Sequence, residues 1–578
     1  MASEQKIRST RPKTCLKFPI KAERHTPVYT IHKFWARRPW NLFSALLNQY
    51  TQPDDIVLDP FCGGGVTVVE AMALHRRVVG VDVNPLAVYI TKMEISPFDR
   101  SLFHDSFERV KTRTEALEQL YRTKCPKCGE DSIFDWMEWD ESKKVPLRLK
   151  VVCKCGSHEK SPDAEDVKLA NKNWKADLEN LWYPKARIPS GDKTDVLRKK
   201  GITHFEQLFT RRNLFALATI LEEIRHLPST QQEFMSFAFS SSLKWASRMC
   251  HLRHAVVEGW ALHAYWIYPK SLELNIWRVF ERRARALTRG KDFSNKTIGS
   301  YYRLGREFGD FASGATCLVI NSSSKKLPIP SNSVDAVITD PPYGGNVNYG
   351  ELADYWLVWI DRDRLMDKTD EAIINRHQKK ALIDYENHLS DIFSECARVL
   401  KINTRMVMTF NSNDPRVVAS CIKAATRSGF TLDSEGIVYQ PPITAYSTTS
   451  HGIFVGSFLG DFILSFQKRK FNPISNKITL LEFKSRIENI VQEYDRGQGS
   501  GEEAVKQQIY CEFLPFLARN VLLDPISCDE ALTCVRTSLR ILEKSFNIDR
   551  QKTIEERRVA FLRSSSSSLQ RPTNGVRN

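Results

Sequence analysis

Asp340-Pro341-Pro342-Tyr343 is the stretch of this chain whose residue types carry the most chemistry. The Asp340 carboxylate and the Pro341 carbonyl are both acceptors, so together they can draw the two hydrogens of a planar amino group out of conjugation with its ring. The prolines fix φ and keep the carbonyl directed at the amine, and the tyrosine offers an aromatic face to a flipped base. The pattern is typical of methyl transfer to an exocyclic amine, and also of an ordinary exit from a strand.

This tetrapeptide directly follows the apolar run of residues 334–339, which predicts a buried strand. In open α/β sheets, ligands bind beyond the carboxyl ends of the strands. The acceptor groups therefore stand where such a sheet would hold its site.

A glycine turn is the second chemical signal. Residues 56–59 read as a short apolar strand, and the glycine turn after it leads into a helix predicted over 68–75. The glycines let the backbone approach a ligand, and the helix N-terminus offers free N–H groups to an anion such as a methionine carboxylate. A further strand ends at Asp82, close to the spacing at which an acidic residue meets the ribose hydroxyls of a nucleoside cofactor.

These residues favour S-adenosylmethionine (SAM) as the cofactor. The stretch from Phe61 to Gly65 lacks the third glycine of the dinucleotide fingerprint. An Asp-Pro-Pro-Tyr sequence at a strand end is also foreign to dehydrogenases. A turn that binds NAD, or no ligand at all, is the alternative interpretation.

Together the two motifs resemble the amino-methyltransferases of DNA, which make N6-methyladenine or N4-methylcytosine. Residues 32–39, 346–356 and 395–401 resemble the adenine-specific members that carry an inserted zinc ribbon. The resemblance implies transfer of a methyl group from SAM to N6 of a flipped adenine in double-stranded DNA. It also implies a role in restriction-modification or phage defence, with other subunits of such a system as partners.

The resemblance assigns a role to individual residues. It gives the cofactor to Phe34, Asp59, Phe61, Gly63, Gly65, Thr67, Asp82 and Asn84. It gives the target base to Asp340, which orients the amine, to the Pro341 carbonyl, to Pro342, and to Tyr343, which stacks on the base. One departure is visible, because residues 321–324 read Asn-Ser-Ser-Ser where such enzymes often place an acidic contact to the cofactor adenine, so no residue is assigned to that contact.

Four cysteines form a set with metal-ligand spacing. Cys125 and Cys128 enclose two residues, Cys153 and Cys155 enclose one, and a glycine follows each pair. Four thiolates in tetrahedral geometry make a closed, structural zinc site, so no position remains for catalysis. The sequence predicts a zinc ribbon over about residues 120–160, with His158 as a substitute ligand and unconnected cysteines as the alternative.

The order of these signals predicts an α/β fold, in which a Rossmann-like SAM-dependent methyltransferase sheet is split by a large, mostly helical insertion with a zinc ribbon, and a C-terminal helical region follows. We expect an N-terminal extension (1–24), the cofactor half (25–95), an inserted target-recognition region (96–314), the catalytic half (315–470), a helical domain (471–555) and a disordered tail (556–578).

The charge balance fits a partner rich in phosphate. The chain has 84 Lys and Arg against 68 Asp and Glu, a net charge of +16. Such a charge favours DNA, although a solvated basic surface would give the same count. The arginines of a helix predicted over 274–287, the segment 171–187 and the loop 440–460 are the candidate DNA contacts.

Composition also predicts a cytoplasmic protein without a membrane segment. No apolar run approaches the length of a membrane span, and the first residues lack the apolar core of a signal peptide. The 13 cysteines, an odd number, indicate reduced thiols rather than a disulfide framework.

Two other classes of function stay open. One is the same chemistry on another amine, namely cytosine N4 in DNA, a base in RNA or a protein glutamine. The other is a non-catalytic recognition subunit that keeps the fold. Against the second stand the intact Gly63, Gly65, Asp82 and Asp340, which a retired site has no physical need to retain.

Overall fold

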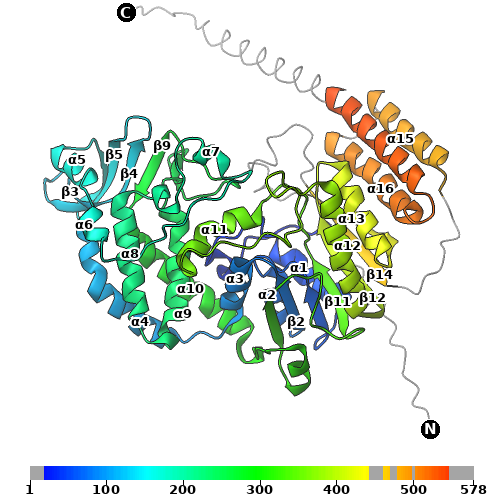
Figure 1. Cartoon of the computed structure of the whole chain (residues 1–578), viewed down its shortest axis with the longest axis horizontal. Coiled ribbons are helices and arrows are strands. Elements are labelled where there is room, and N and C mark those ends of the chain that lie inside the picture. Colours follow the sequence, from blue (N-terminus) through cyan, green and yellow to red (C-terminus); the bar gives the residue numbers. More distant parts are fainter. Residues whose placement is uncertain (1–18, 442–459, 469–477, 497–500, 546–578) are drawn as a thin grey trace, which may run out of the picture. The chain divides into compact units, whose positions relative to one another are not determined.

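The computed structural model describes residues 19–441, 460–468, 478–496 and 501–545 (Figure 1). The chain divides into two compact units, residues 1–408 and 409–578. Most of the loop expected over 440–460, and all of the tail expected over 556–578, lie outside the described residues. In the described part of the chain, no helix combines the length and the apolar character needed to cross a bilayer.

A parallel sheet forms the centre of the first unit, with the strand order β10-β2-β1-β11-β12. The strands are β1 (Ile56–Asp59), β2 (Arg77–Asp82), β10 (Cys317–Asn321), β11 (Val334–Thr339) and β12 (Leu400–Phe410). Their apolar runs are buried along almost their whole length, as expected for strands covered on both faces. The α/β, Rossmann-like fold predicted from the sequence is confirmed.

The strand order reverses between β1 and β11. The chain leaves β1 toward β2 on one side, whereas β11 pairs with β1 on the other side. A crevice opens at such a switch point beyond the carboxyl ends of the strands, so the sheet directs the ends of β1 and β11 to one place.

Helices cover this sheet, and local sequence explains where they begin. They are α1 (Trp40–Tyr50), α2 (Val66–Ala73), α3 (Pro85–Ile95), α11 (Tyr349–Ile360) and α12 (Leu382–Val399). Figure 1 shows α2 and α3 beside the strands that they contact. Asn84 caps α3 by accepting the Leu86 N–H at 3.0 Å, and Pro85 fits the first turn, where its missing N–H costs nothing.

The inserted region joins helices to an antiparallel sheet. Its strands are β3 (Arg122–Lys124), β4 (Asp131–Asp140), β5 (Val145–Cys153), β6 (Gly156–Lys160) and β9 (Lys270–Leu274), in the order β3-β4-β5-β6 with β9 on β4. Its longer helices are α4 (Arg100–Thr114), α8 (Arg211–Arg225), α9 (Ser229–Ser242) and α10 (Ile276–Thr297). The short elements between them are α5 (Ala164–Ala170), α6 (Lys175–Leu178), α7 (Asp195–Arg198), β7 (His251–Arg253) and β8 (Val256–Glu258).

Helix α11 connects the inserted region to a later segment of the first unit. The carboxylate of Glu351, a residue of α11, accepts hydrogen bonds from the backbone N–H groups of Asp192 at 3.2 Å and Lys193 at 2.8 Å. It also accepts one from the side-chain amide of Asn375 at 2.7 Å. Ten consecutive residues of α11 are buried, including Trp356. The motif found in the sequence over 346–356 is therefore a buried connection between segments that are far apart in the chain.

The second unit contains the end of β12 and the antiparallel pair β13 (Phe430–Gln440) and β14 (Asp461–Lys468), in the order β12-β14-β13. Its helices are α13 (Pro415–Arg427), α15 (Leu480–Asp495), α16 (Glu502–Asn520) and a further helical stretch over 525–545. Phe483 and Phe516 pack with ring centroids 4.5 Å apart in the core between α15 and α16. The helical character expected after the sheet holds in these described residues.

Candidate active site

One cavity in the first unit collects side chains from the ends of β1, β2 and β11. Among the residues predicted from the sequence, its lining includes Phe34, Asp59, Phe61, Gly63, Thr67, Asp82, Asn84, Asp340 and Pro342. The structure therefore brings most of the expected cofactor residues together with the first residue of the Asp-Pro-Pro-Tyr motif.

The glycine turn is shaped to approach a ligand closely. Gly63 and Gly65 have φ of +48° and +77°, in the region that side-chain-bearing residues rarely adopt. A Cβ at Gly65 would lie 2.9 Å from the Thr91 hydroxyl, and one at Gly64 would lie 2.7 Å from Nε of Arg37. Gly64, to which the sequence assigned no role, is thus as constrained as its neighbours.

Asp82 is fixed with its carboxylate at the cavity wall. One oxygen accepts the Gly63 N–H at 2.8 Å, and the other accepts the Asn84 N–H at 2.8 Å. Burial raises the pKa of Asp82 to about 7, and the two backbone hydrogen bonds oppose that rise. Each oxygen has a second lone pair, so the group can still accept hydrogen bonds from a pair of hydroxyls.

Asp59 has a different environment. It is 3% exposed and accepts the Thr339 hydroxyl at 2.6 Å and the Phe61 N–H at 3.1 Å. Burial raises its pKa to about 6. The hydrogen bond from Thr339 connects the end of β11 to the end of β1, so Asp59 holds these two strand ends together.

Asp340 makes two contacts that the sequence did not indicate. The Arg38 guanidinium donates from Nε to one Asp340 oxygen at 2.9 Å, and the Tyr343 hydroxyl donates to the other. The centre of the same guanidinium lies 4.9 Å from the centroid of the Tyr343 ring. The carbonyl of Pro342 is held by the buried Tyr385 hydroxyl at 2.7 Å.

Other residues of the cavity were missed by sequence reasoning. Tyr349 stacks on Phe34 with centroids 5.7 Å apart, and Asp370 and Glu371 enter from the segment after α11. Asp370 pairs with Lys325 at 3.0 Å, which lies directly after the Asn-Ser-Ser-Ser stretch. Asp370 and Glu371 thus reach the cavity from a later part of the chain. In that part, the sequence had indicated only the motif over 346–356.

The cavity wall is rich in carboxylates. The acidic side chains in the lining are those of Asp59, Asp82, Asp340, Asp370 and Glu371. The basic side chains in it are Arg37 and Arg38, and both are paired with acids. Such a wall favours a ligand that carries positive charge.

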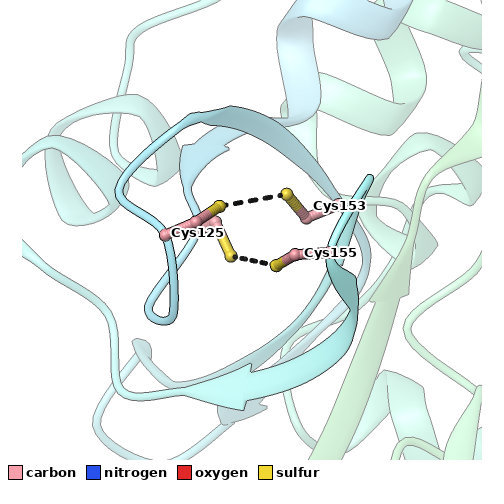
Figure 2. A group of neighbouring side chains, drawn as sticks. Cys125, Cys153 and Cys155 are labelled. Carbon is pink, nitrogen blue, oxygen red and sulfur yellow. Dashed lines mark hydrogen bonds between the residues drawn. The ribbon is translucent and has the colours of Figure 1, made fainter.

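The four predicted metal ligands gather in the inserted region. Their sulfur atoms lie within 4.8 Å of one another, and Figure 2 shows those of Cys125, Cys153 and Cys155 pointing toward a common centre. Zinc–sulfur bonds of about 2.3 Å in a tetrahedron would set the sulfurs about 3.8 Å apart, so the arrangement fits a zinc ion. His158 Nε2 lies 3.3 Å from the Cys155 sulfur, beside the set of thiols.

Three of the α10 arginines, Arg282, Arg283 and Arg285, have partners within the chain. Arg282 pairs with Asp135 at 3.1 Å, and Arg285 pairs with Glu281 at 2.6 Å. Arg283 donates to the Thr30 carbonyl at 2.6 Å and connects α10 to the segment that leads into the cavity. The apolar side chains Trp277 and Phe280 of the same helix are buried.

Known proteins match the chain in sequence. The DNA methylase family matches residues 4–93. The type II methyltransferase M.MjaII of Methanocaldococcus jannaschii is 21% identical over 409 residues, which cover 67% of this chain and 73% of that protein. M.MvaI of Kocuria varians is 20% identical, with 57% of this chain and 55% of that protein covered. M.HindIII of Haemophilus influenzae is 41% identical over 49 residues, 8% of this chain and 16% of that protein.

The parallel sheet and the cavity beyond its strands define a Rossmann-like α/β fold. In sequence, the chain is therefore similar to the DNA methylase family over residues 4–93 and to three type II methyltransferases.

Proposed function

We propose that this chain transfers a methyl group from SAM to the N6 amine of adenine in double-stranded DNA. The observation that carries the proposal is that the glycine turn, Asp82 and Asp340 line one cavity. The first two suit a nucleoside cofactor, and the third is an acceptor for an amino group. An aspartate as first residue of the motif leans toward adenine in the enzymes that it resembles.

The cavity fits SAM in shape and in charge. Gly63, at positive φ, lies in the cavity wall beside Phe34, and Phe34 and Tyr349 form an aromatic wall. The Asp82 carboxylate would accept the ribose hydroxyls. The other carboxylates would favour the cationic sulfur, which supplies a methyl group and leaves as a neutral thioether.

Asp340 and its neighbours would handle the amine. The Asp340 carboxylate accepts one amine hydrogen and the Pro341 carbonyl accepts the other, so the nitrogen lone pair turns toward the methyl carbon. Bound SAM would supply the methyl group to this nitrogen, and the surplus proton of the amine would pass to Asp340 or to water. The tyrosine side chain would stack on the base after it leaves the duplex.

The Cys125, Cys128, Cys153 and Cys155 set would hold a structural zinc ion. All four ligands are thiols and the site is closed, so the metal would stabilise the inserted sheet and take no part in the transfer. The inserted region as a whole would grip the duplex beside the cavity. A role in restriction-modification or phage defence, with partner subunits, extends the proposal.

The test is to express the chain in a host without DNA methylation and to read the modified bases by single-molecule sequencing. N6-methyladenine at a defined site is the expected result. N4-methylcytosine would keep the chemistry and change the base. Unmodified DNA, combined with transfer of label from SAM to RNA or protein in vitro, would overturn the assignment to DNA.

A further inference from the structure

Arg38 occupies the surroundings that the proposed function gives to the target base. A flipped base needs an acceptor for its amine and an aromatic face for its ring. In the structure, Arg38 donates Nε–H to Asp340 at 2.9 Å, and its planar guanidinium lies 4.9 Å from the centroid of the Tyr343 ring. Planar N–H groups over an aromatic ring are the features that a guanidinium and an amino base share.

From this geometry we propose that Arg38 is a placeholder for the target base, which must leave Asp340 before a base can enter. This inference rests on the proposed function, because it names the residue that the base displaces. Asp340 has both oxygens engaged, one with Arg38 and one with the Tyr343 hydroxyl. Neither hydrogen bond can persist unchanged when an amine takes the same carboxylate.

The burial of the pair explains why it forms in the empty site. The side chains of Arg38 and Asp340 are 11% and 22% exposed. Without Arg38, one Asp340 oxygen would lose its donor at this depth, which carries a desolvation cost, and the arginine removes that cost. The incoming base restores an N–H donor, so the exchange replaces one hydrogen bond by another instead of exposing a bare carboxylate.

Arg38 also belongs to the segment that covers the cofactor. Phe34 contacts Gly63, and Arg37 contacts Gly64, so both lie over the glycine turn. Arg38 follows them directly and reaches from the cofactor side of the cavity to the base side. Its departure from Asp340 therefore moves a residue that is covalently close to the cofactor wall.

The first experiment measures nucleoside binding. Protein saturated with S-adenosylhomocysteine, which blocks the cofactor pocket, is titrated calorimetrically with adenosine and with cytidine. Arg38→Ala should bind one of the two about tenfold more tightly than the parent, because the closed form no longer competes. Arg38→Lys, which keeps the charge without the planar group, should lie between them. The matched control Arg285→Ala, whose arginine pairs with Glu281 on α10, should behave as the parent.

An Arg38→Ala protein that is folded and binds both nucleosides no better than the parent would overturn the inference. Failure of S-adenosylhomocysteine to bind would refute the proposed function. A second measurement then decides whether Asp340 holds Arg38. Labelling of arginines by phenylglyoxal, read by mass spectrometry, should rise several-fold at Arg38 in Asp340→Asn and stay constant at Arg285. Unchanged labelling of Arg38 would show that Asp340 does not hold it.

Discussion

The carboxyl group of Asp82, at the end of β2, is one that changes its charge near neutral pH. Asp82 has a pKa raised to about 7 by burial, with both oxygens already bonded to backbone N–H groups. Ribose hydroxyls donate best to the ionised group. In the proposed function, a proton bound to Asp82 would be released when SAM enters, which would couple binding to pH near neutrality.

We predict that SAM affinity rises with pH up to about pH 7 and levels off above it. Below the folded pKa the protonated form of Asp82 dominates and opposes binding. Asp82→Asn should remove most of this dependence and weaken binding roughly 10- to 100-fold, the range for a hydrogen bond to a charged group. Isothermal titration between pH 5.5 and 8.5 measures both, and an unchanged pH profile in Asp82→Asn would assign the proton to another group.

Mutations should distinguish the residues that act on the base from those that bind the cofactor. Asp340→Ala should abolish methylation while SAM binding stays within a few-fold, because the proposed function makes Asp340 the acceptor for the amine. Gly65→Val should remove cofactor binding, since its φ of +77° and its contact with Thr91 leave no place for a side chain. Equilibrium binding and labelled-methyl transfer distinguish the two, and near-normal turnover of Asp340→Ala would contradict the catalytic assignment.

At the scale of elements, a buried ion pair positions the segment that bears Phe34 and Arg38. Arg37 donates to Glu94 on α3 at 2.7 Å and to the Tyr29 carbonyl at 2.7 Å. The two charged side chains are 5% and 0% exposed. At this depth neither charge could be accommodated without the other, so the pair holds the segment against the glycine turn.

Replacement of Arg37 by Met should lower the free energy of unfolding by about 3–5 kcal/mol, because it leaves Glu94 without its partner. SAM affinity should fall with it, since Arg37 contacts Gly64. The exposed pair of Lys168 and Glu165, both 79% exposed, offers a matched control. Urea titration measures the free energy of unfolding of both variants. Glu165→Gln should lower it by less than about 1 kcal/mol, and equal losses in the two variants would show that burial is not the cause.

The inserted sheet should depend on its metal. Cys125→Ser or Cys153→Ser should release about one equivalent of zinc and loosen the β3 to β6 region, since a structural site contributes its binding energy to folding. Elemental analysis and limited proteolysis give the two readouts. The control is Cys421→Ser, which changes a buried cysteine of α13 in the second unit. This variant should retain the zinc of the inserted sheet. Protein prepared without chelator that contains no zinc would refute the site.

For the whole molecule, the net charge of +16 predicts that DNA binding weakens steeply as salt rises. The arginines of α10 were expected from the sequence to contribute phosphate contacts. In the structure Arg282 and Arg285 are committed to Asp135 and Glu281. An arginine already neutralised by an acid releases few counterions from DNA, so these two should contribute little.

The double change Arg282→Gln and Arg285→Gln should therefore leave the slope of log K against log salt nearly unchanged. A phosphate contact would contribute about 0.9 to that slope, so the loss of two contacts is well resolved. Fluorescence anisotropy with a labelled duplex at several salt concentrations measures it. A slope shallower by about two would place α10 on the DNA, and a parental slope would direct attention to the segment 171–187.

Short-range signals in the sequence were enough to find the sheet, the glycine turn and the four cysteines. Strands and turns depend on neighbouring residues, so the apolar runs that end at Asp59, Asp82 and Thr339 already indicate where ligands bind. The Asp-Pro-Pro-Tyr motif gave the chemistry of the amine for the same reason, since its groups are adjacent in the chain.

Only the tertiary structure decided which side chains meet across the site. Arg38 and Asp340 are 302 positions apart, and nothing in either local sequence indicates that they pair. Asp370 and Glu371 reach the cavity because the segment after α11 folds back. Arg282 of α10 likewise pairs with Asp135, a residue far from it in the sequence. Such contacts depend on how distant elements pack, whereas sequence patterns report only the period and the ends of each element.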